Sequence, residues 1–433
     1  MYRVNSQRTG LRSLRQLGLV AALGLFGFSV QAAELEAGTV INAANYEQVK
    51  GDTFEGHVIE DMLTPFMQSL IQDNHLEIPL IHSTPWVSAE KWVAATEKYS
   101  GQVKYDPVTR EVTDWVAGLV FPPAVIDAQT DPKAAGDMII YNWFLSPAVI
   151  ADDVKVGGAG FNFFTLDGGY ERNQGARNDQ IRMIGRASSA EHTLDPEVVK
   201  RQFVVVTSPY DVAGAGAFSI KYRDERVDDV WAYVKSVRRL RRISGNNWMD
   251  PLAGSDLLGD DNYLLDGHPL WYKSWEVKGK TTILAMAHGT DDYLGRTALT
   301  IEERMNLSKA PYGMPIGLNW EPREVYVVEG IMPDVHPYSR KVLWADAEVP
   351  AVFLMGEMFD KKGEFWKWAM LAGATCDYAD GQTGSCPTDY PVIDFQQRHG
   401  SFITVGYSIQ NGGATVADFQ PAILKKAASG KLK

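Results

Sequence analysis

Residues 351–369, AVFLMGEMFDKKGEFWKWA, contain two runs of apolar and alternating residues on either side of a turn. The first run spans residues 351–358, and the second begins at Gly363. Residues 359–363, FDKKG, have the charged side chains and the glycine that are typical of a tight connection. A connection this short joins antiparallel strands rather than parallel ones. This stretch therefore predicts two neighbouring strands of an antiparallel sheet.

The same character extends over most of the chain beyond residue 200. Short apolar or alternating runs follow one another there, punctuated by Gly, Asp, Asn and Pro. Lys278-Gly279-Lys280 predicts a further hairpin turn between two such runs. We expect a mainly β (α+β) fold built on one large antiparallel sheet. Its predicted strands are 202–206, 215–222, 227–234, 237–243, 272–277, 281–287, 324–330, 340–346, 351–358, 363–369 and 402–409.

Helices are expected nearer the N-terminus. In residues 57–72 the apolar side chains recur every three to four positions, which indicates one face of an amphipathic helix. Met62, Leu63, Phe66 and Met67 lie on that stripe. Pro65 lies inside the predicted helix, where its missing N–H should produce a bend. Residues 86–99 predict a second helix.

The first residues have the plan of a secretory signal. Four arginines precede the uncharged run LGLVAALGLFGFS at residues 17–29, and small residues follow at 30–33. The apolar run is too short to span a bilayer as a helix. We therefore expect residues 1–32 to be a cleaved signal peptide, and the mature protein to be soluble in the periplasm.

Length and composition limit the remaining possibilities. The 433 residues are 45% hydrophobic and 22% charged, which is ordinary globular composition. A formal net charge of −12 opposes binding to nucleic acid, which needs a basic face. The sequence has neither an internal repeat nor a low-complexity linker, so we expect residues 33–433 to form a single domain.

Signatures of catalysis and of metal binding are absent from the sequence. The eight histidines are dispersed without metal-ligand spacing, and neither a GxSxG motif nor a phosphate-binding loop is present. We therefore expect no catalytic residues, no metal and no cofactor. An acidic cluster, Asp256, Asp260, Asp261 and Asp266, does not match the EF-hand spacing. We interpret it as a solvated loop or as a partner of nearby arginines.

Two smaller features complete the residue-level predictions. The only two cysteines, Cys376 and Cys386, flank a turn-rich stretch and should form a structural disulfide in an exported protein. On the predicted strand 237–243, four basic residues stand out in an acidic chain. They form surface ion pairs or contact an anionic headgroup or acidic partner, and they are Arg238, Arg239, Arg241 and Arg242.

Two segments together resemble a known family. Residues 229–243, DVWAYVKSVRRLRRI, lead to Gly254-Ser255-Asp256, and residues 339–346, SRKVLWAD, continue to 359–367, FDKKGEFWK. This pattern resembles the domain-of-unknown-function family numbered 1329, which is related to the outer-membrane lipoprotein-sorting (LolA-like) proteins. The resemblance implies a strongly curved antiparallel sheet, an incomplete barrel with helices covering its concave face. LolA-like relatives hold acyl chains in that hollow, although this chain is about twice their usual size.

The resemblance also implies a role. Members of the family are often encoded near RND-type exporters and a companion outer-membrane family, which implies a periplasmic carrier or chaperone for a lipid or other hydrophobic compound. We expect the helix at 57–72 to act as a lid over the concave face. The predicted ligand contacts are Met62, Leu63, Phe66, Met67, Trp231 and Tyr233. The alternatives are a structural or interaction module of the cell envelope, and a periplasmic hydrolase whose residues converge only in three dimensions.

Overall fold

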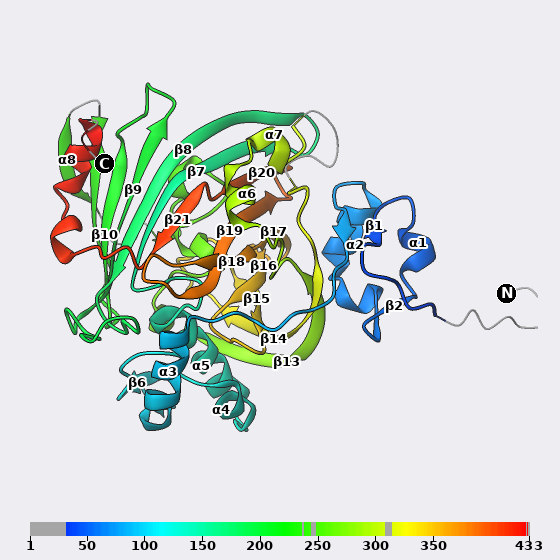
Figure 1. The fold of residues 1–433 in the computed structure, drawn as a ribbon, viewed down its shortest axis with the longest axis horizontal. Helices are drawn as coiled ribbons and strands as arrows, with labels where there is room; N and C mark the ends of the chain where they lie inside the picture. Colours follow the sequence, from blue (N-terminus) through cyan, green and yellow to red (C-terminus); the bar gives the residue numbers. More distant parts are fainter. Residues whose placement is uncertain (1–31, 236–237, 244–247, 308–313, 430, 432–433) are drawn as a thin grey trace, which may run out of the picture.

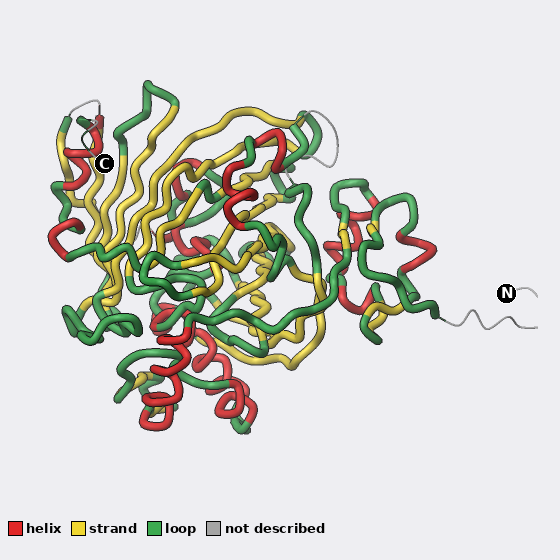
Figure 2. The backbone as a smooth tube through the Cα atoms, in the orientation of Figure 1, coloured by secondary structure: helices red, strands yellow, loops and turns green. Residues whose placement is uncertain are grey.

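The computed structural model describes residues 32–235, 238–243, 248–307, 314–429 and 431. Most of the predicted signal peptide and parts of the segments around Arg238–Ile243 therefore lie outside the described residues. Within them, fifteen strands form one large antiparallel sheet that curves strongly (Figures 1 and 2). The sheet order is β12-β11-β10-β9-β8-β7-β20-β19-β17-β16-β15-β14-β13.

The first half of the sheet is a meander in chain order. Each strand pairs with the next one along the sequence, so the strands step outward from the middle of the sheet to one edge. The members are β7 (Asp153–Thr165), β8 (Gly169–Arg182), β9 (Val198–Ser208), β10 (Gly216–Tyr222), β11 (Asp229–Val234) and β12 (Arg239–Ile243).

The second half begins at the opposite edge and steps back to the middle. Its members are β13 (Ser274–Ala285), β14 (Glu321–Ile331), β15 (Arg340–Asp346), β16 (Phe353–Phe359), β17 (Phe365–Met370), β18 (Ala372–Asp377), β19 (Thr383–Asp394), β20 (His399–Thr404) and β21 (Tyr407–Gln410). β18 pairs with β19, and β20 and β21 both pair with β7.

The two edges do not meet. Among the described residues β12 pairs only with β11, and β13 pairs only with β14, so the sheet remains open. The structure thus confirms the expected fold class, a mainly β protein with a large antiparallel sheet that is not closed into a barrel. The turn predicted at residues 359–363 is also confirmed, because it joins β16 to β17.

The hairpin predicted at Lys278-Gly279-Lys280 is wrong. Residues 274–285 form one continuous strand, β13, which pairs along its whole length with β14. The register shifts between Val277 and Gly279, where a bulge takes up one residue. Gly279 has φ of +150° and nothing lies near its α-carbon on the side-chain side. A glycine between alternating runs therefore marks a bulge as readily as a turn.

The N-terminal helix is shorter than predicted, and its proline has a different role. Residues 57–72 form β3 (His57–Val58), a 3-10 turn (Glu60–Met62) and α2 (Pro65–Gln72). Thr64 caps α2 by accepting a hydrogen bond from the Met67 N–H. Pro65 is the first residue of the helix, where an N–H would have no partner in any case. It therefore starts α2 instead of bending it.

α2 covers the convex face of the sheet, not the concave one. Phe66 stacks on Phe365 with 4.1 Å between ring centroids and meets Phe395 edge-on at 4.0 Å. Neighbouring residues of a strand point to opposite faces. On β16 the Glu357 carboxyl lies close to Thr64 of this N-terminal segment, whose side chain opposes the rise that burial causes in the pKa of Glu357. A side chain at the adjacent Gly356 would instead approach Leu264 on the other face.

Other short elements complete the N-terminal region. A small group of elements around α2 lies to one side of the sheet (Figure 1). It comprises β1 (Val40–Ile41), α1 (Tyr46–Val49), β2 (Thr53–Phe54) and β4 (Ile78–Pro79). The following segment includes α3 (Glu90–Tyr99), which confirms the second predicted helix, then β5 (Lys104–Asp106), β6 (Glu111–Thr113) and α4 (Pro123–Asp127).

The longest helix, α5 (Pro132–Leu145), was not predicted. Twelve of its fourteen residues are buried, including the polar Asp137 and Asn142, so the helix is buried on almost all sides and lacks the one-sided apolar stripe that periodicity detects. Asp131 caps its N-terminus and Pro132 occupies the first turn. Gly136 lets the helix pack directly on β13, because a Cβ there would lie 2.6 Å from the Trp275 backbone.

The concave face is crossed by an inserted segment between β12 and β13, which we call the crossing segment (residues 248–271). It contains three 3-10 turns, Leu252–Gly254, Gly259–Leu264 and Pro269–Trp271. Short helices α6 (Tyr293–Ala298), α7 (Ile301–Arg304) and α8 (Ile423–Ala428) lie at other places around the sheet. The crossing segment, and not the 57–72 helix, therefore covers the concave side.

Candidate functional site

An apolar cavity lies between the crossing segment and the concave face of the sheet. Its volume is about 180 Å³. Strands β7 to β11, β19 and β20 contribute to its walls, which brings together residues from 156 to 405 of the chain. Its apolar lining includes Val156, Ala159, Phe161, Ala176, Val204, Ala217, Val230, Leu252, Leu257, Leu371, Ile403 and Val405.

Strand alternation explains why these strands can enclose a cavity. On β10, Ala217, Ser219 and Lys221 face the cavity, while the intervening Phe218 belongs to a separate hydrophobic cluster on the other face. Small residues such as Ala217 leave space that a leucine or phenylalanine would fill. The cavity therefore results from small side chains on the concave face, not from missing backbone.

The crossing segment is fixed to the sheet by a wholly buried charge network. The Lys341 ammonium on β15 lies 2.7 Å from Asp260 Oδ2 and 2.7 Å from Asp261 Oδ1. Tyr272 donates a hydrogen bond to Asp260, and Tyr338 donates one to Asp261 at 2.6 Å. Burial raises the pKa of Asp260, but Lys341 and His336 outweigh it and lower this pKa to about 2.

At Asp260 and Asp261, the acidic cluster is therefore neither a solvated loop nor a partner of the nearby arginines. Asp260 and Asp261 are fully buried, and their cation is a lysine 80 residues further along the chain. Lys341 lies within a segment that the family resemblance identified, but alternation along a strand does not reveal that a lysine is buried. Only the strand register places it opposite the two carboxylates.

A second anchor of the crossing segment is Asp256. Its carboxylate accepts a hydrogen bond from the Ser401 hydroxyl at 2.6 Å and lies 2.8 Å from His399 Nδ1. His399 Nε2 lies 3.4 Å from Glu171. The hydrogen bond that the Asp256 carboxylate accepts from His399 raises the pKa of His399 above its usual value, and burial opposes this effect only partly.

The Ser401, Asp256 and His399 side chains do not form a catalytic triad. In a triad the histidine accepts the proton of the nucleophile and the carboxylate lies behind the histidine. Here the carboxylate lies between the two, and the serine bonds to Asp256 instead of to His399. This group holds the crossing segment on β20.

Trp231 and Tyr233 lie on the opposite face from the cavity. Both belong to β11 and pack against the hydrophobic cluster that includes Phe218, Phe203 and Leu424 of α8. Trp231 and Phe218 have ring centroids 5.8 Å apart. The cavity wall on β11 is instead formed by Val230, which alternates with Trp231.

The predicted N-terminal contacts are likewise away from the cavity. Met62, Leu63 and Met67 are buried in the main hydrophobic core, and Phe66 packs against it. The structure brings these four residues together on the convex face, but it does not bring them to Trp231, Tyr233 or the cavity. Their role in ligand binding remains a prediction.

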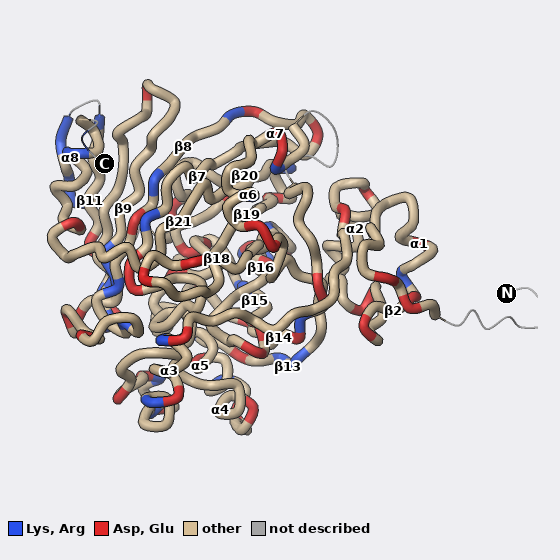
Figure 3. The backbone as a smooth tube through the Cα atoms, in the orientation of Figure 1, with Lys and Arg blue, Asp and Glu red and all other residues tan. Residues whose placement is uncertain are grey.

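The arginines of the predicted basic strand lie at a sheet edge. All four are exposed. Arg239 and Arg241 alternate with Arg242 on β12, and Arg242 pairs with Asp229 of the neighbouring strand. Arg238 precedes the strand with φ of 51°. Figure 3 shows basic residues gathered at this side of the molecule, near α8.

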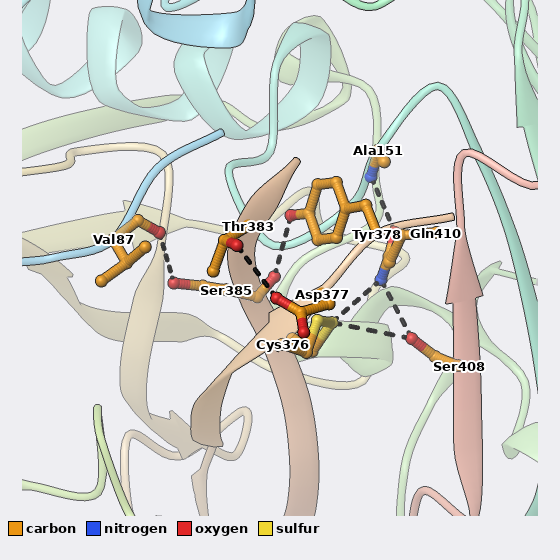
Figure 4. Close-up of a disulfide and its surroundings, with 10 residues drawn as sticks. Val87, Ala151, Cys376, Asp377, Tyr378, Thr383, Ser385, Ser408 and Gln410 are labelled. Carbon is orange, nitrogen blue, oxygen red and sulfur yellow. Dashed lines mark hydrogen bonds between the residues drawn. A yellow bond between two sulfur atoms is a disulfide. The ribbon is translucent and has the colours of Figure 1, made fainter. Parts of the chain in front are cut away.

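The predicted disulfide is present. Cys376 on β18 and Cys386 on β19 are bonded across the hairpin, with 5.9 Å between their α-carbons (Figure 4). Gln410 of β21 donates hydrogen bonds to the Cys386 sulfur at 3.6 Å and to the Ser408 hydroxyl at 3.1 Å. The disulfide therefore fixes one hairpin and adjoins the strand that pairs with β7.

The residues that the structure describes contain neither a metal-binding cluster nor a membrane-spanning helix. In that part of the chain, no three His, Cys, Asp or Glu side chains are grouped so that they could hold a metal ion. Each of its helices is too short or too polar to cross a lipid bilayer.

Together these features define a class, an open antiparallel sheet whose concave face holds an apolar cavity beneath an inserted segment. The chain belongs to the family described as "Protein of unknown function (DUF1329)", whose model matches residues 40–425. This match confirms the family that the sequence resembles. None of the curated proteins matches the chain.

The chain is also similar, at low sequence identity, to several solved structures. A DUF1329 family protein from Desulfovibrio piger is 18% identical, with a TM-score of 0.47, over 68% of this chain and 100% of that one. A domain described as an outer membrane lipoprotein-sorting protein, from Vibrio parahaemolyticus, is 17% identical, with a TM-score of 0.44, over 63% and 91%. A LolA superfamily protein from Nitrosomonas europaea is 12% identical, with a TM-score of 0.36, over 67% and 98%.

Proposed function

We propose that this protein is a periplasmic carrier that binds a lipid or other hydrophobic compound in the cavity beneath the crossing segment. The observation that supports this proposal most directly is the apolar lining of that cavity, contributed by seven strands of the concave face. Ligand sites are typically concave and mostly apolar, with a few polar groups that orient the ligand. Family resemblance and the predicted signal peptide support the location.

Within this proposal, residues 33–433 act as one unit, and the protein carries its ligand without catalysing a reaction. An RND-type envelope transporter and an outer-membrane protein are the proposed partners that supply or receive the ligand. The exposed arginines of β12 are the proposed contact with an acidic partner or an anionic headgroup. The hydrophobic ligand itself is proposed to enter beneath the crossing segment.

A cavity-filling substitution tests the proposal. We expect Ala217→Trp to weaken the binding of an uncharged fluorescent hydrophobic probe by roughly tenfold or more, because the new indole occupies the space that the probe needs. Fluorescence titration measures the affinity, and thermal unfolding shows that the variant is folded. Organic extracts of natively purified protein, analysed by mass spectrometry, should contain a recurrent hydrophobic species.

The matched control is Ala44→Trp, at an exposed residue of the N-terminal region far from the cavity. It should bind the probe like the unmodified protein. If folded Ala217→Trp binds the probe as tightly as the control, the cavity is not the binding site. If the unmodified protein neither binds the probe nor retains an extractable compound, the alternative of a structural module is favoured.

A further inference from the structure

We propose that the cavity selects an uncharged amphiphile and recognises it through a hydroxyl or carbonyl group, at a polar row formed by Asn178, Gln202 and Ser219. This inference rests on the proposed function and adds the class of ligand. It follows from the order of side chains along the cavity wall, from the pairing of the charges at one end, and from hydrogen-bonding groups that remain available.

The cavity wall changes from apolar to charged in the direction of the strands. On β9 and β10 the paired residues that alternate toward the concave face are Val204 with Ala217, then Gln202 with Ser219, then Lys200 with Lys221. Successive pairs on one face lie about 7 Å apart. An elongated molecule can therefore lie with its chain on the apolar rows and one polar group at Gln202 and Ser219.

The charges at the far end are paired with one another. Lys221 Nζ lies 3.0 Å from Asp228 and 3.8 Å from Asp266, and Lys200 Nζ lies 2.8 Å from Asp266. This end thus holds two ammonium groups and two carboxylates. Burial lowers the pKa of Lys221, but the two carboxylates outweigh it and raise this pKa. The group is neutral as a whole and its ions have partners inside the protein.

An anionic ligand would disturb this arrangement. To reach Lys221, a carboxylate must displace Asp228, the carboxylate nearest to it, whose side chain is only 13% exposed and which then loses its ion pair. Asp266 keeps its contact with Lys200. Burial already raises the pKa of Asp228 despite its contact with Lys221, so this carboxylate has no favourable alternative environment. Leaving a buried charge unpaired is strongly unfavourable. The charged end therefore limits the cavity to ligands without a negative charge.

The polar row, in contrast, has hydrogen-bonding groups to offer. Gln202 Nε2 donates to Asn178 Oδ1 at 2.9 Å. Three groups of this row have no hydrogen-bond partner among the described residues. They are the amide hydrogens of Asn178, the side-chain carbonyl oxygen of Gln202 and the hydroxyl of Ser219. All three residues line the cavity. A ligand hydroxyl can both donate to Gln202 and accept from Asn178 or Ser219.

The first test compares two ligands that differ only in the head group. Displacement of the uncharged fluorescent probe by 1-octanol and by octanoate is measured at about pH 8, where the carboxylic acid is ionised. We expect octanol to bind roughly tenfold or more tightly than octanoate, because only the anion disrupts the ion pairs. Equal or tighter binding of octanoate would overturn the inference while leaving the proposed carrier function intact. If neither ligand nor the probe binds, the carrier function itself fails.

Substitutions at Ser219 and at Asp228 test the two parts of the inference, the polar row and the paired charges. Ser219→Ala should weaken octanol binding by roughly fivefold, the worth of about one hydrogen bond, and Ser219→Thr should restore it. Ser274→Ala, on β13 outside the cavity, is the matched control and should have no effect. Asp228→Asn should tighten octanoate binding, because one carboxylate fewer leaves Lys221 available. If Ser219→Ala binds octanol like the control, or Asp228→Asn does not gain octanoate affinity, the assigned row is wrong.

Discussion

At the scale of single residues, Lys341 is a buried side chain that anchors the crossing segment to the sheet. Its ammonium is completely buried, and the carboxylates of Asp260 and Asp261 are its direct partners. The two carboxylates raise its pKa although burial alone would lower it. A lysine in this position is therefore charged at neutral pH, and its removal leaves two buried anions facing each other.

We expect Lys341→Met to lower the free energy of unfolding by about 3–5 kcal/mol, because breaking a buried ion pair leaves an uncompensated charge. Urea denaturation of the unmodified protein and the variant measures this difference. Lys362→Met, at the exposed turn between β16 and β17, is the control and should change stability by less than about 0.5 kcal/mol. A loss below about 1 kcal/mol for Lys341→Met would show that the network does not hold the segment.

His399 gives the crossing segment a dependence on pH. Asp256 raises the pKa of His399 in the folded protein above that in the unfolded chain. The contribution of the protonated His399 imidazole to the free energy of unfolding is therefore complete below the pKa of histidine in the unfolded chain, about 6.5. It disappears as the pH rises through the higher pKa of His399 in the folded protein. The advantage of the unmodified protein over His399→Gln should shrink as the pH rises through this window.

Chemical denaturation at a series of pH values provides the measurement. Comparing each value with the variant removes the contribution of other groups, including His268, whose pKa burial lowers to about 4. That histidine acts at lower pH and in both proteins alike. A stability difference that grows with pH would contradict the assigned contact between His399 and Asp256.

At the scale of elements, α2 is the clearest case in which packing and ligand contact can be separated. Phe66 stacks on Phe365 and meets Phe395 edge-on on the convex face. We expect Phe66→Ala to lower the free energy of unfolding by about 2–4 kcal/mol through the cavity it creates, while probe binding beneath the crossing segment stays unchanged. Denaturation and fluorescence titration on the same preparations measure both quantities.

Tyr210→Ala is the matched control for Phe66→Ala, because the Tyr210 side chain is an aromatic ring with 91% exposure and should affect neither quantity. The opposite pattern, a loss of probe binding with little loss of stability, would support the lid that the sequence analysis predicts. The same pair of measurements thus decides between the two roles of the Met62–Met67 stripe.

Elements that alternate clearly in sequence were predicted well. β10, β11, β12, β15, β16 and β17 all fall within a residue or two of their predicted ranges, and β14 begins three residues earlier than predicted. β7 and β8 were missed because glycine and polar residues interrupt their pattern, as in Gly157-Gly158 and the run from Glu171 to Asn173. α5 was missed for a different reason, since it is buried on almost every side and has no polar face to alternate with an apolar one.

At the scale of the whole molecule, the family and the open sheet could be predicted from the sequence, but the site could not. The cavity depends on residues from 156 to 405 facing one space, and it includes Ala217 and Ser219, which have no unusual pattern of their own. Their importance comes from register, that is, from which strand lies beside which. The predicted aromatic contacts were chosen by residue type and lie on other faces.

The pairing of β7 with β20 joins the two halves of the sheet, and the partners are residues 160–165 and 399–404. More than 230 residues separate them, so this seam can close only after nearly the whole chain is available. A chain synthesised or threaded through a channel from its N-terminus therefore keeps one side of β7 unpaired until the last strands emerge. Unpaired strand edges attract other chains, and non-local pairing is slow. The molecule thus needs protection during the interval between the synthesis of its first half and its last forty residues.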